Sequence, residues 1–458
     1  MGNLTRMRAV GVVTAVAALT LAGCGDGGDA GSGSGGGSRQ KLVMWFWGAP
    51  PAHQKTMTQV LVDGFNGAQS KYTLSVTYDN NVDKNVQVAL AANKGPDVVY
   101  SSGPSYAAAY AAEGKLADMT PYAEKYGWKD SLLDPMYQSG TQNGKLYSLP
   151  NSVSTYGVFY NKKVLAKLGV QPPATFADLT AAMDKAKAAG LYASVTGNKG
   201  WKPVNLDYAS IFLNHDAGPG PVYDAVEGRT PWTDPALVKA VDDSAAFYKS
   251  GYLAGKDYSN LNFDQSMQLL SVGKSPFFFA PTLAFQFATD YFNDAAKNTD
   301  DLGFVAFPNV NSSLTAPMYT LGTTAALSVN ANSANKDGAA EVINYMMSQK
   351  FFTEMTKTWP GYWGVPLKTL GSVDPSQFTG LSAVYVKALQ DMNTAVAAGN
   401  FGLDISTFFP PGTQTALTDI DTVWLGKSSA ADFLKRVQTA YDKDKASGLL
   451  APVPQPKS

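Results

Sequence analysis

The sequence predicts an α/β fold divided into two lobes, and three observations support this prediction. The chain has 458 residues, more than a single hydrophobic core usually serves. From about residue 41 to 114, apolar strand-like runs alternate with helical segments, which is the rhythm of a parallel sheet covered by helices. The apolar fraction of 45% is that of a globular protein, and aromatic residues are abundant at 12%.

The first strand is expected at Lys41–Gly48, an apolar run that ends in Trp45, Phe46 and Trp47 and is closed by Gly and Pro. Because side chains alternate along a strand, Trp45 and Trp47 should share one side and Phe46 the other. We expect Phe46 in the core and one of the tryptophans at a ligand cleft, because open α/β sheets bind ligands at the carboxyl ends of their strands. The alternative for each ring is packing in the core.

The same periodicities predict the remaining elements in order. Further strands are expected at Tyr72–Tyr78, Asp97–Tyr100, Lys145–Pro150, Tyr156–Asn161, Pro276–Ala280, Phe304–Phe307 and Ala325–Val329. Helices are expected at Lys55–Asn66, about 82–93, Tyr106–Gly114, Val164–Leu168, Phe176–Ala189, part of Lys202–Leu213, Pro235–Ser250, Phe263–Ser271, Gly338–Ser348, Lys350–Thr358, Ser382–Ala398, Thr413–Leu425 and Ala430–Lys445. Gly218–Thr230 is rich in Gly and Pro and is predicted to be a surface loop.

The N-terminus carries a secretory signal. A short basic segment precedes Ala9–Leu21, which has the length of a signal-peptide core and is too short to span a bilayer. It runs into Leu21-Ala22-Gly23-Cys24, which resembles the lipobox of bacterial lipoproteins. We therefore expect a signal peptide over 1–24 with lipidation of Cys24, followed by a flexible Gly/Ser-rich linker over 25–40. The alternative is an ordinary secretory leader with an incidental cysteine.

Composition excludes several classes of function. Cys24 is the only cysteine, and His53 and His215 are the only histidines, so neither a His/Cys metal site nor a Cys/His nucleophile pair is expected. We expect no cofactor and no metal. The formal net charge of −1 implies no basic face for nucleic acid, so no nucleic-acid partner is expected.

Arginine is scarce, and this bears on the charge of the ligand. After the leader only Arg39, Arg229 and Arg436 remain, far apart in the sequence. Carboxylate and phosphate ligands are usually held by the planar guanidinium fork. A neutral polar ligand is therefore favoured over an anion, although lysines or helix N-termini could hold one.

Several short motifs, each weak alone, occur in a specific order. They are Lys41-Leu42-Val43-Met44-Trp45, Gly95-Pro96-Asp97-Val98-Val99, Glu113-Gly114-Lys115-Leu116 with Asp118, Tyr147-Ser148-Leu149-Pro150, Tyr160-Asn161-Lys162, Pro172-Pro173-Ala174-Thr175-Phe176, and Asn335-Lys336 with Ala339-Ala340. From about residue 41 to the end, this set resembles the sugar-binding lipoproteins of bacterial ABC importers. That extracellular solute-binding family includes the maltose/maltodextrin-binding protein.

The resemblance implies a periplasmic-binding-protein-like fold with two discontinuous lobes, hinge strands and an interlobe cleft. The N-terminal lobe would comprise 41–152 plus about 319–368, and the C-terminal lobe 153–318 plus about 369–458. The protein would be a monomer, lipid-anchored on the extracellular face of the cell membrane. It would capture a mono- or oligosaccharide and deliver it to the permease subunits of an ABC transporter.

Sugars present hydroxyl edges and apolar faces, so a site for them needs aromatic rings together with polar side chains. From the N-terminal lobe the candidates are Trp45, Trp47, Asn80, Ser102 and Ser105. From the C-terminal lobe they are Tyr156, Trp201, Asp207, Pro281 and Phe285. From the crossing segments they are Tyr319, Gly322, Trp359, Tyr362 and Trp363. Packing within a local core is the alternative for Trp201 and for the 359–363 aromatics.

The chain also departs from the maltodextrin-binding pattern. Leu283 stands where that pattern has a tryptophan after the apolar strand, so a long stacking track for linear maltodextrins is not predicted. Two other functions remain open: binding of a non-sugar solute such as an amine or peptide, and glycan hydrolysis by Asp207 with Asp264 or Asp97. No nucleophile motif supports an enzyme, and we expect none.

Overall fold

The computed structural model describes residues 38–200, 202–450 and 452–457. The predicted signal peptide with Cys24, most of the predicted linker and Trp201 lie outside the described residues. The chain divides into the units Met1–Ser38 and Arg39–Ser458, and the description that follows concerns the second unit. No helix in the described part is both long and apolar enough to cross a membrane.

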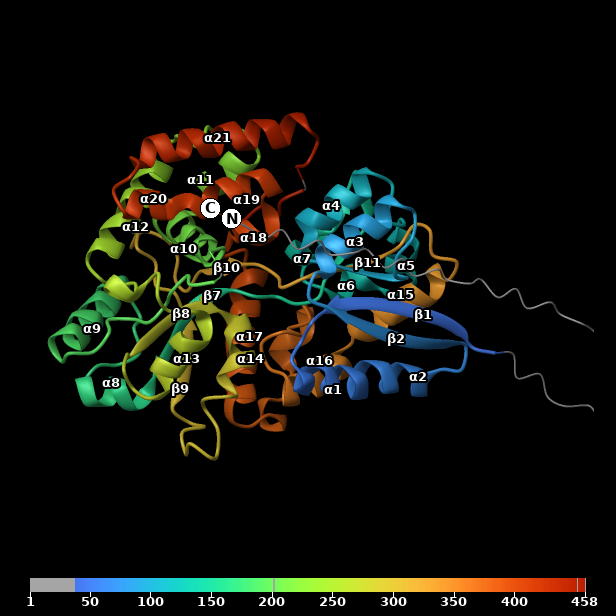
Figure 1. The fold of residues 1–458 in the computed structure, drawn as a ribbon, viewed down its shortest axis with the longest axis horizontal. Coiled ribbons are helices and arrows are strands. Elements are labelled where there is room, and N and C mark those ends of the chain that lie inside the picture. The colour runs from blue at the N-terminus through green and yellow to red at the C-terminus, as the bar shows by residue number, and fades with distance from the viewer. Residues whose placement is uncertain (1–37, 201, 451, 458) are drawn as a thin grey trace, which may run out of the picture. The chain divides into compact units, whose positions relative to one another are not determined.

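A five-stranded sheet is built mainly from the early part of this unit, with the strand order β2-β1-β3-β11-β6 (Figure 1). Its strands are β1 (Gln40–Trp47), β2 (Tyr72–Asp79), β3 (Val98–Ser101), β6 (Leu149–Pro150) and β11 (Ala326–Val329). β1 runs parallel to β2 and β3, as the alternation of strands and helices predicts. β11 comes from far along the chain and pairs antiparallel with β3 and β6.

Alternation along β1 places its rings as predicted. Leu42, Met44 and Phe46 are fully buried, whereas Trp45 and Trp47 are half-buried. Helices then cover the sheet, and they are α1 (Pro51–Met57), α2 (Gly64–Ala68), α3 (Val82–Ala91), α4 (Pro104–Ala112), α15 (Lys336–Met346) and α16 (Gln349–Thr358). Smaller elements complete this half, namely a π-helical turn at Thr58–Asp63, α5 (Thr120–Tyr126), α6 (Trp128–Ser131), α7 (Asp134–Ser139), β4 (Thr141–Gln142) and β5 (Lys145–Leu146).

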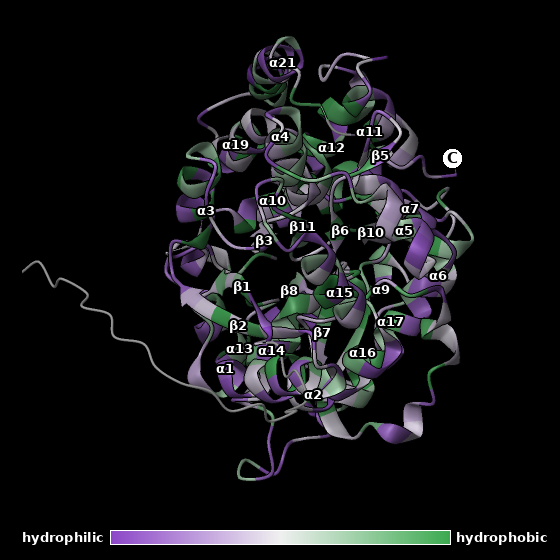
Figure 2. Ribbon diagram, turned by 90° about the vertical axis from the view of Figure 1, so that its right-hand side faces the viewer, coloured by the Kyte–Doolittle hydropathy of each residue, from purple (hydrophilic) through white to green (hydrophobic). Residues whose placement is uncertain are grey.

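A three-stranded antiparallel sheet organises the rest of the unit, in the order β8-β7-β9. Its strands are β7 (Tyr156–Asn161), β8 (Phe277–Pro281) and β9 (Leu302–Ala306). β8 begins with three phenylalanines, is buried along its whole length and is coloured as hydrophobic in Figure 2. A strand that is apolar at successive positions must be covered on both faces.

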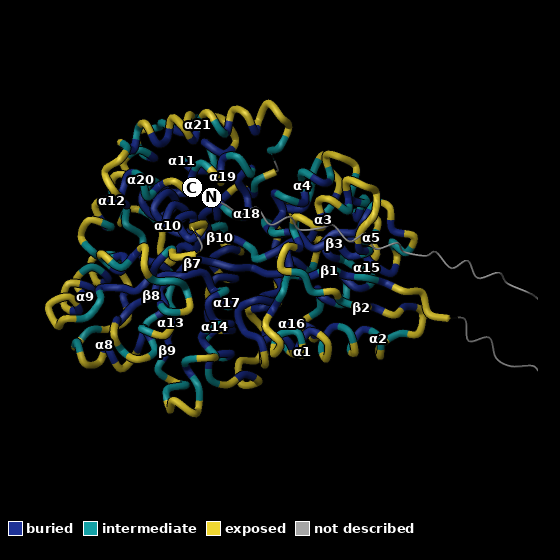
Figure 3. Tube along the Cα trace, in the orientation of Figure 1, coloured by how far each residue is buried: buried dark blue, intermediate teal, exposed yellow. Residues whose placement is uncertain are grey.

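Two of the helices around this sheet begin at side-chain caps that the sequence shows. Asn161 caps α8 (Lys162–Leu168), and Thr175 and Asp178 form a capping box at the start of α9 (Phe176–Ala188). The others are α10 (Val204–Phe212), α11 (Pro219–Val226), α12 (Pro235–Lys249), α13 (Phe263–Ser271), α14 (Phe285–Ala288), α17 (Gly380–Ala397), α18 (Ile405–Phe408), α19 (Pro411–Leu417), α20 (Asp421–Trp424) and α21 (Ala430–Ala446). Their exposed residues face outward around buried strands (Figure 3).

Two predictions about secondary structure are wrong. Gly218–Thr230 is mostly helical, because α11 starts with Pro219, whose missing N–H costs nothing at a first helical position. The predicted helix Thr413–Leu425 is divided into α19, a 3-10 turn and α20. The sequence analysis also missed a parallel pair of three-residue strands, β10 (Tyr319–Leu321) and β12 (Phe401–Leu403).

Segments around residues 151–155, 322–325 and 364 lie side by side between the two sheets and are hydrogen-bonded to one another. They are called the joining segments below. Ser154 and Gly322 exchange both backbone bonds at 2.8 Å, and the Val153 amide donates to the Gly364 carbonyl at 2.6 Å. Asn151 is fully buried among them, and its side-chain oxygen accepts a hydrogen bond of 2.9 Å from the Thr324 hydroxyl. The joining segments are therefore tied together by backbone and side-chain bonds.

An aromatic cluster lies at the end of β1, next to the joining segments. Phe46 stacks on Trp363 at 5.7 Å between ring centroids and meets Trp359 and Tyr362 edge-on. The hydroxyl groups of Tyr100 and Tyr362 are 3.0 Å apart and hydrogen-bonded. Rings of this size dominate core energetics, so the cluster fixes the loop that follows α16 against the first sheet.

Gly361 lies in this loop, where the backbone is closely packed against neighbouring backbone atoms. Its φ is +105°, and a Cβ there would lie 2.9 Å from the Gln286 amide nitrogen and 3.0 Å from the Leu283 carbonyl oxygen. We expect Gly361→Ala to lower the free energy of unfolding by more than about 2 kcal/mol, because strain and overpacking add. Gly114→Ala is the control, since Gly114 has φ +71° but no atom within 4 Å of a new Cβ. Urea denaturation measures both variants. An equal loss in the free energy of unfolding for Gly361→Ala and Gly114→Ala would contradict the tight packing at Gly361.

Candidate functional site

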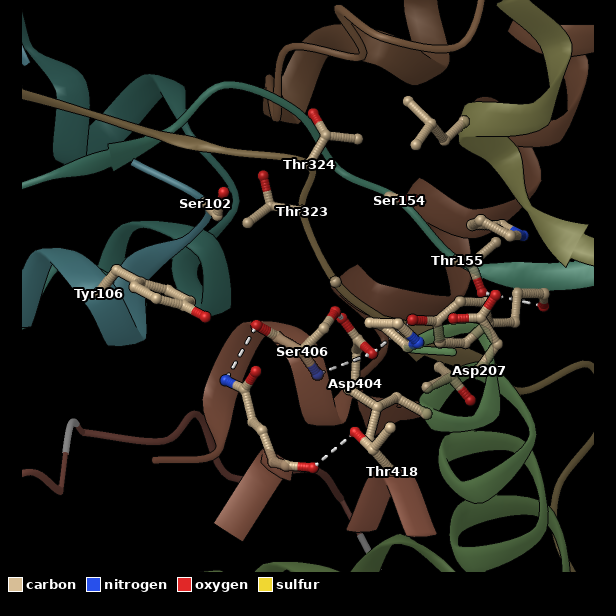
Figure 4. Close-up of a pocket in the computed structure, with 18 of the residues that line it drawn as sticks. Ser102, Tyr106, Ser154, Thr155, Asp207, Thr323, Thr324, Asp404, Ser406 and Thr418 are labelled. Carbon is tan, nitrogen blue, oxygen red and sulfur yellow. Dashed lines mark hydrogen bonds between the residues drawn. The ribbon is translucent and has the colours of Figure 1, made fainter. Parts of the chain in front are cut away.

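A cavity of about 390 Å³ opens where the joining segments meet the end of the three-stranded sheet (Figure 4). Such a volume is near the low end of the roughly 300–1,000 Å³ of ligand pockets, which suits a small ligand. Most lining side chains carry hydroxyl groups, and these are Ser102, Tyr106, Ser154, Thr155, Tyr156, Thr320, Thr323, Thr324, Ser406, Thr415 and Thr418. The rest of the lining is Pro203, Leu206, Asp207, Pro281, Leu283, Gly322, Asp404, Pro411 and Gln414.

The structure brings five of the predicted site residues to this cavity. They are Ser102, Tyr156, Asp207, Pro281 and Gly322. Tyr156 and Pro281 face each other as paired residues at the ends of β7 and β8. The Ser102 hydroxyl, just after β3, donates to Asp83 at 2.6 Å. The ends of strands from both sheets therefore contribute to one hollow.

The other N-terminal candidates lie outside this lining. Trp45 and Trp47 are half-buried, and the Trp47 ring packs against Tyr362 at 5.9 Å between centroids. Asn80 is exposed, beside Gly48. Ser105 is buried just behind the lining, where its hydroxyl accepts a hydrogen bond of 3.2 Å from Gln414.

The later aromatic candidates are buried elsewhere. Trp359, Tyr362 and Trp363 belong to the aromatic cluster around β1. Phe285 is fully buried against Phe159, with ring centroids 4.7 Å apart. Tyr319 is buried and lines a second hollow beside β9, together with residues that include Pro172, Phe304 and Met318. Trp201 lies outside the described residues.

Asp404 is the best-connected side chain of the cavity. Its Oδ1 accepts hydrogen bonds from the Tyr156 hydroxyl at 2.7 Å, the Ser210 hydroxyl at 3.3 Å and the Ser406 amide at 3.2 Å. Its Oδ2 accepts from the hydroxyls of Ser406 at 2.5 Å and Thr407 at 2.7 Å. A carboxylate that only accepts, from five donors, has the hydrogen-bond pattern of the ionised form.

Gly322 is needed where the chain passes Asp404. A Cβ at position 322 would lie 2.7 Å from Asp404 Oδ2 and 2.9 Å from its Cβ, closer than real side-chain contacts. The Asp404 amide also donates to the carbonyl of Leu321 at 2.9 Å. Glycine therefore lets the joining segment run directly over the carboxylate.

Asp207 differs from Asp404 because the protein supplies it with few donors: in the described part of the chain only the Tyr156 hydroxyl, which donates to Asp404, also lies near enough to favour its charged form. It lies on α10, is 5% exposed, and its Oδ2 is buried and unpartnered. Burial, together with the negative charge of Asp404, raises the pKa of Asp207 well above its ordinary value. In the free protein this acid therefore holds a proton more readily than an ordinary aspartate.

A buried histidine orients another lining hydroxyl. His215 Nε2 lies 3.1 Å from the Thr320 hydroxyl, and Nδ1 lies 2.9 Å from Asn309 Oδ1. Burial lowers the pKa of His215 to about 4, so the ring is neutral near pH 7. Because Asn309 Oδ1 can only accept, Nδ1 carries the hydrogen and Nε2 accepts from Thr320.

Asp404 and most of the hydroxyl residues of the cavity were not predicted from the sequence. Asp404 directly follows β12, a strand too short to show a periodic pattern. It also caps α18 through the Ser406 amide, so an acidic residue before Ile405-Ser406-Thr407 was the available signal. Thr323 and Thr324 lie in the same joining segment as the predicted candidates Tyr319 and Gly322, but they were not predicted themselves.

Among the described residues that line the cavity there is no lysine, arginine or histidine. It can hold a polar ligand through hydroxyl groups and acidic oxygens, with Leu206, Pro281 and Leu283 offering apolar contact. Neither Asp97 nor Asp264 lines it, so the acid pairs considered for glycan hydrolysis do not meet there. In the part of the chain that the structure describes, no group of three His, Cys, Asp or Glu residues is arranged to hold a metal ion.

The chain forms two sheets, each with its own helices, and the hydrogen-bonded joining segments connect them beside a polar cavity. This arrangement is the two-lobe periplasmic-binding-protein fold. The comparisons with known proteins agree. Residues 50–350, more than half of the chain, match the model of the bacterial extracellular solute-binding protein family. The chain belongs to this family.

Individual relatives cover the chain to different extents. A probable sugar-binding periplasmic protein of Mesorhizobium japonicum is 36% identical over 106 residues, 23% of this chain and 25% of that protein. The sn-glycerol-3-phosphate-binding periplasmic protein of Escherichia coli K12 is 28% identical over 240 residues, 48% of this chain and 53% of that protein. The chain thus spans about a quarter to a half of the length of these curated relatives.

The fold extends over nearly the whole chain in solved structures. One comes from a study of xylan utilization by Caldanaerobius polysaccharolyticus and is 21% identical to this chain. It superimposes with a TM-score of 0.72, covering 87% of this chain and 99% of that one. At this identity the likeness shows the fold alone.

The raised pKa of Asp207 predicts how stability depends on pH. The folded protein holds this proton more tightly than the unfolded chain, so the contribution of Asp207 falls as pH rises above the ordinary aspartate range. We expect Asp207→Asn to raise the free energy of unfolding of the ligand-free protein by about 1–3 kcal/mol near neutral pH, with a smaller gain at acidic pH.

Urea denaturation at both pH values measures this difference. The control is Asp264→Asn, because Asp264 lies outside the cavity and accepts a hydrogen bond of 2.6 Å from the Tyr291 hydroxyl. Asp264→Asn should not raise the free energy of unfolding at either pH. A pH-independent effect of Asp207→Asn would show that Asp207 has an ordinary pKa.

Proposed function

We propose that this protein captures a small carbohydrate in the described cavity and delivers it to the permease of an ABC transporter. The observation that carries the proposal is the lining, which is rich in hydroxyl groups and has no basic side chain. Sugar hydroxyls both donate and accept hydrogen bonds, so they match such a lining, and unmatched buried polar groups would be costly. The name of the Mesorhizobium japonicum relative, a probable sugar-binding periplasmic protein, supports the same class of ligand.

The same lining argues against a phosphorylated ligand such as the one named for the Escherichia coli relative. A phosphate would need arginine, lysine or free backbone amides, and it would face the acids Asp207 and Asp404. We therefore expect this chain to bind sugars without an acidic group.

The volume and the walls indicate a short ligand. Leu283 forms part of the wall, and no tryptophan among the described residues lines the cavity. A long oligosaccharide track built on stacked rings would need such residues, so we favour a mono- or disaccharide. The lobes proposed from the sequence, 41–152 plus about 319–368 and 153–318 plus about 369–458, would close on it about the joining segments.

A panel of neutral and amino sugars tests the proposal by tryptophan fluorescence and calorimetry. We expect saturable binding without consumption of the sugar. Tyr156→Phe should weaken binding by about tenfold, because it removes the hydroxyl that donates to Asp404. Tyr147→Phe, outside this cavity, is the matched control. Turnover of a glycan, or binding of peptides and not sugars, would overturn the proposal.

We also propose that Cys24 carries a lipid that holds the protein on the extracellular face of the cell membrane. We expect Cys24→Ala to move the protein from the membrane fraction to the medium, because no other membrane anchor is predicted from the sequence. Cell fractionation and immunoblotting measure this. Membrane retention of the variant would argue against a lipid anchor at this position.

A further inference from the structure

The two acids of the cavity, Asp207 and Asp404, differ in how many hydrogen bonds the protein gives them, and this difference indicates what the ligand must supply. We propose that the ligand is an amino sugar whose protonated amine pairs with Asp207. This inference rests on the proposed carbohydrate function and specifies the chemical class of the sugar. It depends on the hydrogen-bond partners of Asp207 and Asp404 and on the charges that surround them.

Asp404 is already satisfied by the protein. Its five donors come from β7, α10 and α18, and they use both carboxylate oxygens. It therefore contributes a fixed negative charge to the cavity and has little capacity left for a ligand. Tyr156 and Gly322, which contact it, line the same hollow.

Asp207 has no comparable set of hydrogen-bond donors from the protein. The neighbouring polar groups of α10 are committed elsewhere, because the Asn205 amide donates to the Thr418 carbonyl at 2.8 Å and the Ser210 hydroxyl donates to Asp404. An acid that is 5% exposed, and whose Oδ2 has no donor among the described residues, is costly in the free protein, by several kcal/mol if it is ionised. Such a residue is therefore poised to gain a partner from the ligand.

The charge balance favours a cationic partner over a neutral hydroxyl. A sugar hydroxyl would supply one hydrogen bond and leave Asp207 protonated beside the negative charge of Asp404, and no basic residue among the described residues lines the cavity. Lys202, the nearest lysine along the chain, is 47% exposed and pairs with Asp419 and Asp421 instead. An ammonium group on the ligand would neutralise Asp207 and also be attracted by Asp404.

The remaining walls suit the rest of an amino sugar. Ser154, Thr323 and Thr324 line the cavity from the joining segments (Figure 4), and their hydroxyl oxygens, which are bonded within the protein, can still accept. Leu206 and Pro281 add apolar surface. Acylation of the amine would remove its charge and add bulk. The proposed site therefore selects the free amine over both the N-acetyl and the hydroxyl analogue.

Calorimetry with matched sugars tests the proposal, at a pH slightly below neutral where the amine is protonated. The probes are glucosamine, galactosamine and mannosamine, each with its neutral parent and its N-acetyl derivative. We expect at least one amino sugar to bind tenfold or more tightly than both of its analogues. Asp207→Asn should abolish this preference, whereas Asp264→Asn, outside the cavity, should retain it.

The possible outcomes separate this inference from the proposed function. If a neutral or N-acetylated sugar binds as tightly as its amino analogue, the inference is overturned and the carbohydrate function stands. If none of the three amino sugars binds, the inference is also overturned. The proposed carbohydrate function is then tested separately by the binding of neutral oligosaccharides. If simple amines such as ethanolamine bind as tightly as the amino sugars, both proposals fail. The wild-type comparison decides even if a variant does not fold.

Discussion

The carboxylate of Asp404 is the interaction on which the site depends. It joins β7 through Tyr156, α10 through Ser210 and α18 through Ser406, and the joining segment passes over it at Gly322. Hydrogen bonds to a buried charge are stronger than those between neutral groups. One side chain thus holds together segments that are far apart in the sequence and fixes the shape of the cavity.

The same region contains an acid that the fold does not satisfy. Burial of Asp207 without a donor opposes stability, whereas the donors around Asp404 favour it. Functional sites commonly retain groups of this kind, because the missing partner is the ligand. The contrast between two acids in one cavity therefore carries more information on function than the number of polar residues does.

Much of the fold could be predicted from periodicity and caps. The burial of Phe46 followed from strand alternation, and the capping box of Thr175 and Asp178 marks the start of α9. The three-residue strands β10 and β12 could not be predicted, because only their mutual pairing defines them. Asp404 follows β12, so the centre of the site remained hidden with it.

The tryptophan candidates among the described residues do not line the cavity. A ring gains free energy from core packing and from ligand stacking alike, and sequence does not separate the two. The structure buries Trp359 and Trp363 against Phe46, while polar candidates such as Ser102 and Asp207 line the cavity. Ser102 after β3, and Tyr156 and Pro281 at the ends of β7 and β8, show that the ends of strands contribute to the cavity, and Asp207 joins them from α10.

A crystal structure of the protein with its bound sugar is the most direct test of the central claim, that this cavity is the ligand site. The account predicts density for one small sugar between Tyr156 and the joining segment at Gly322, with a polar group of the sugar within hydrogen-bond distance of Asp207. An ordered sugar bound elsewhere, for example on the half-buried Trp45 and Trp47, with this cavity empty, would contradict it.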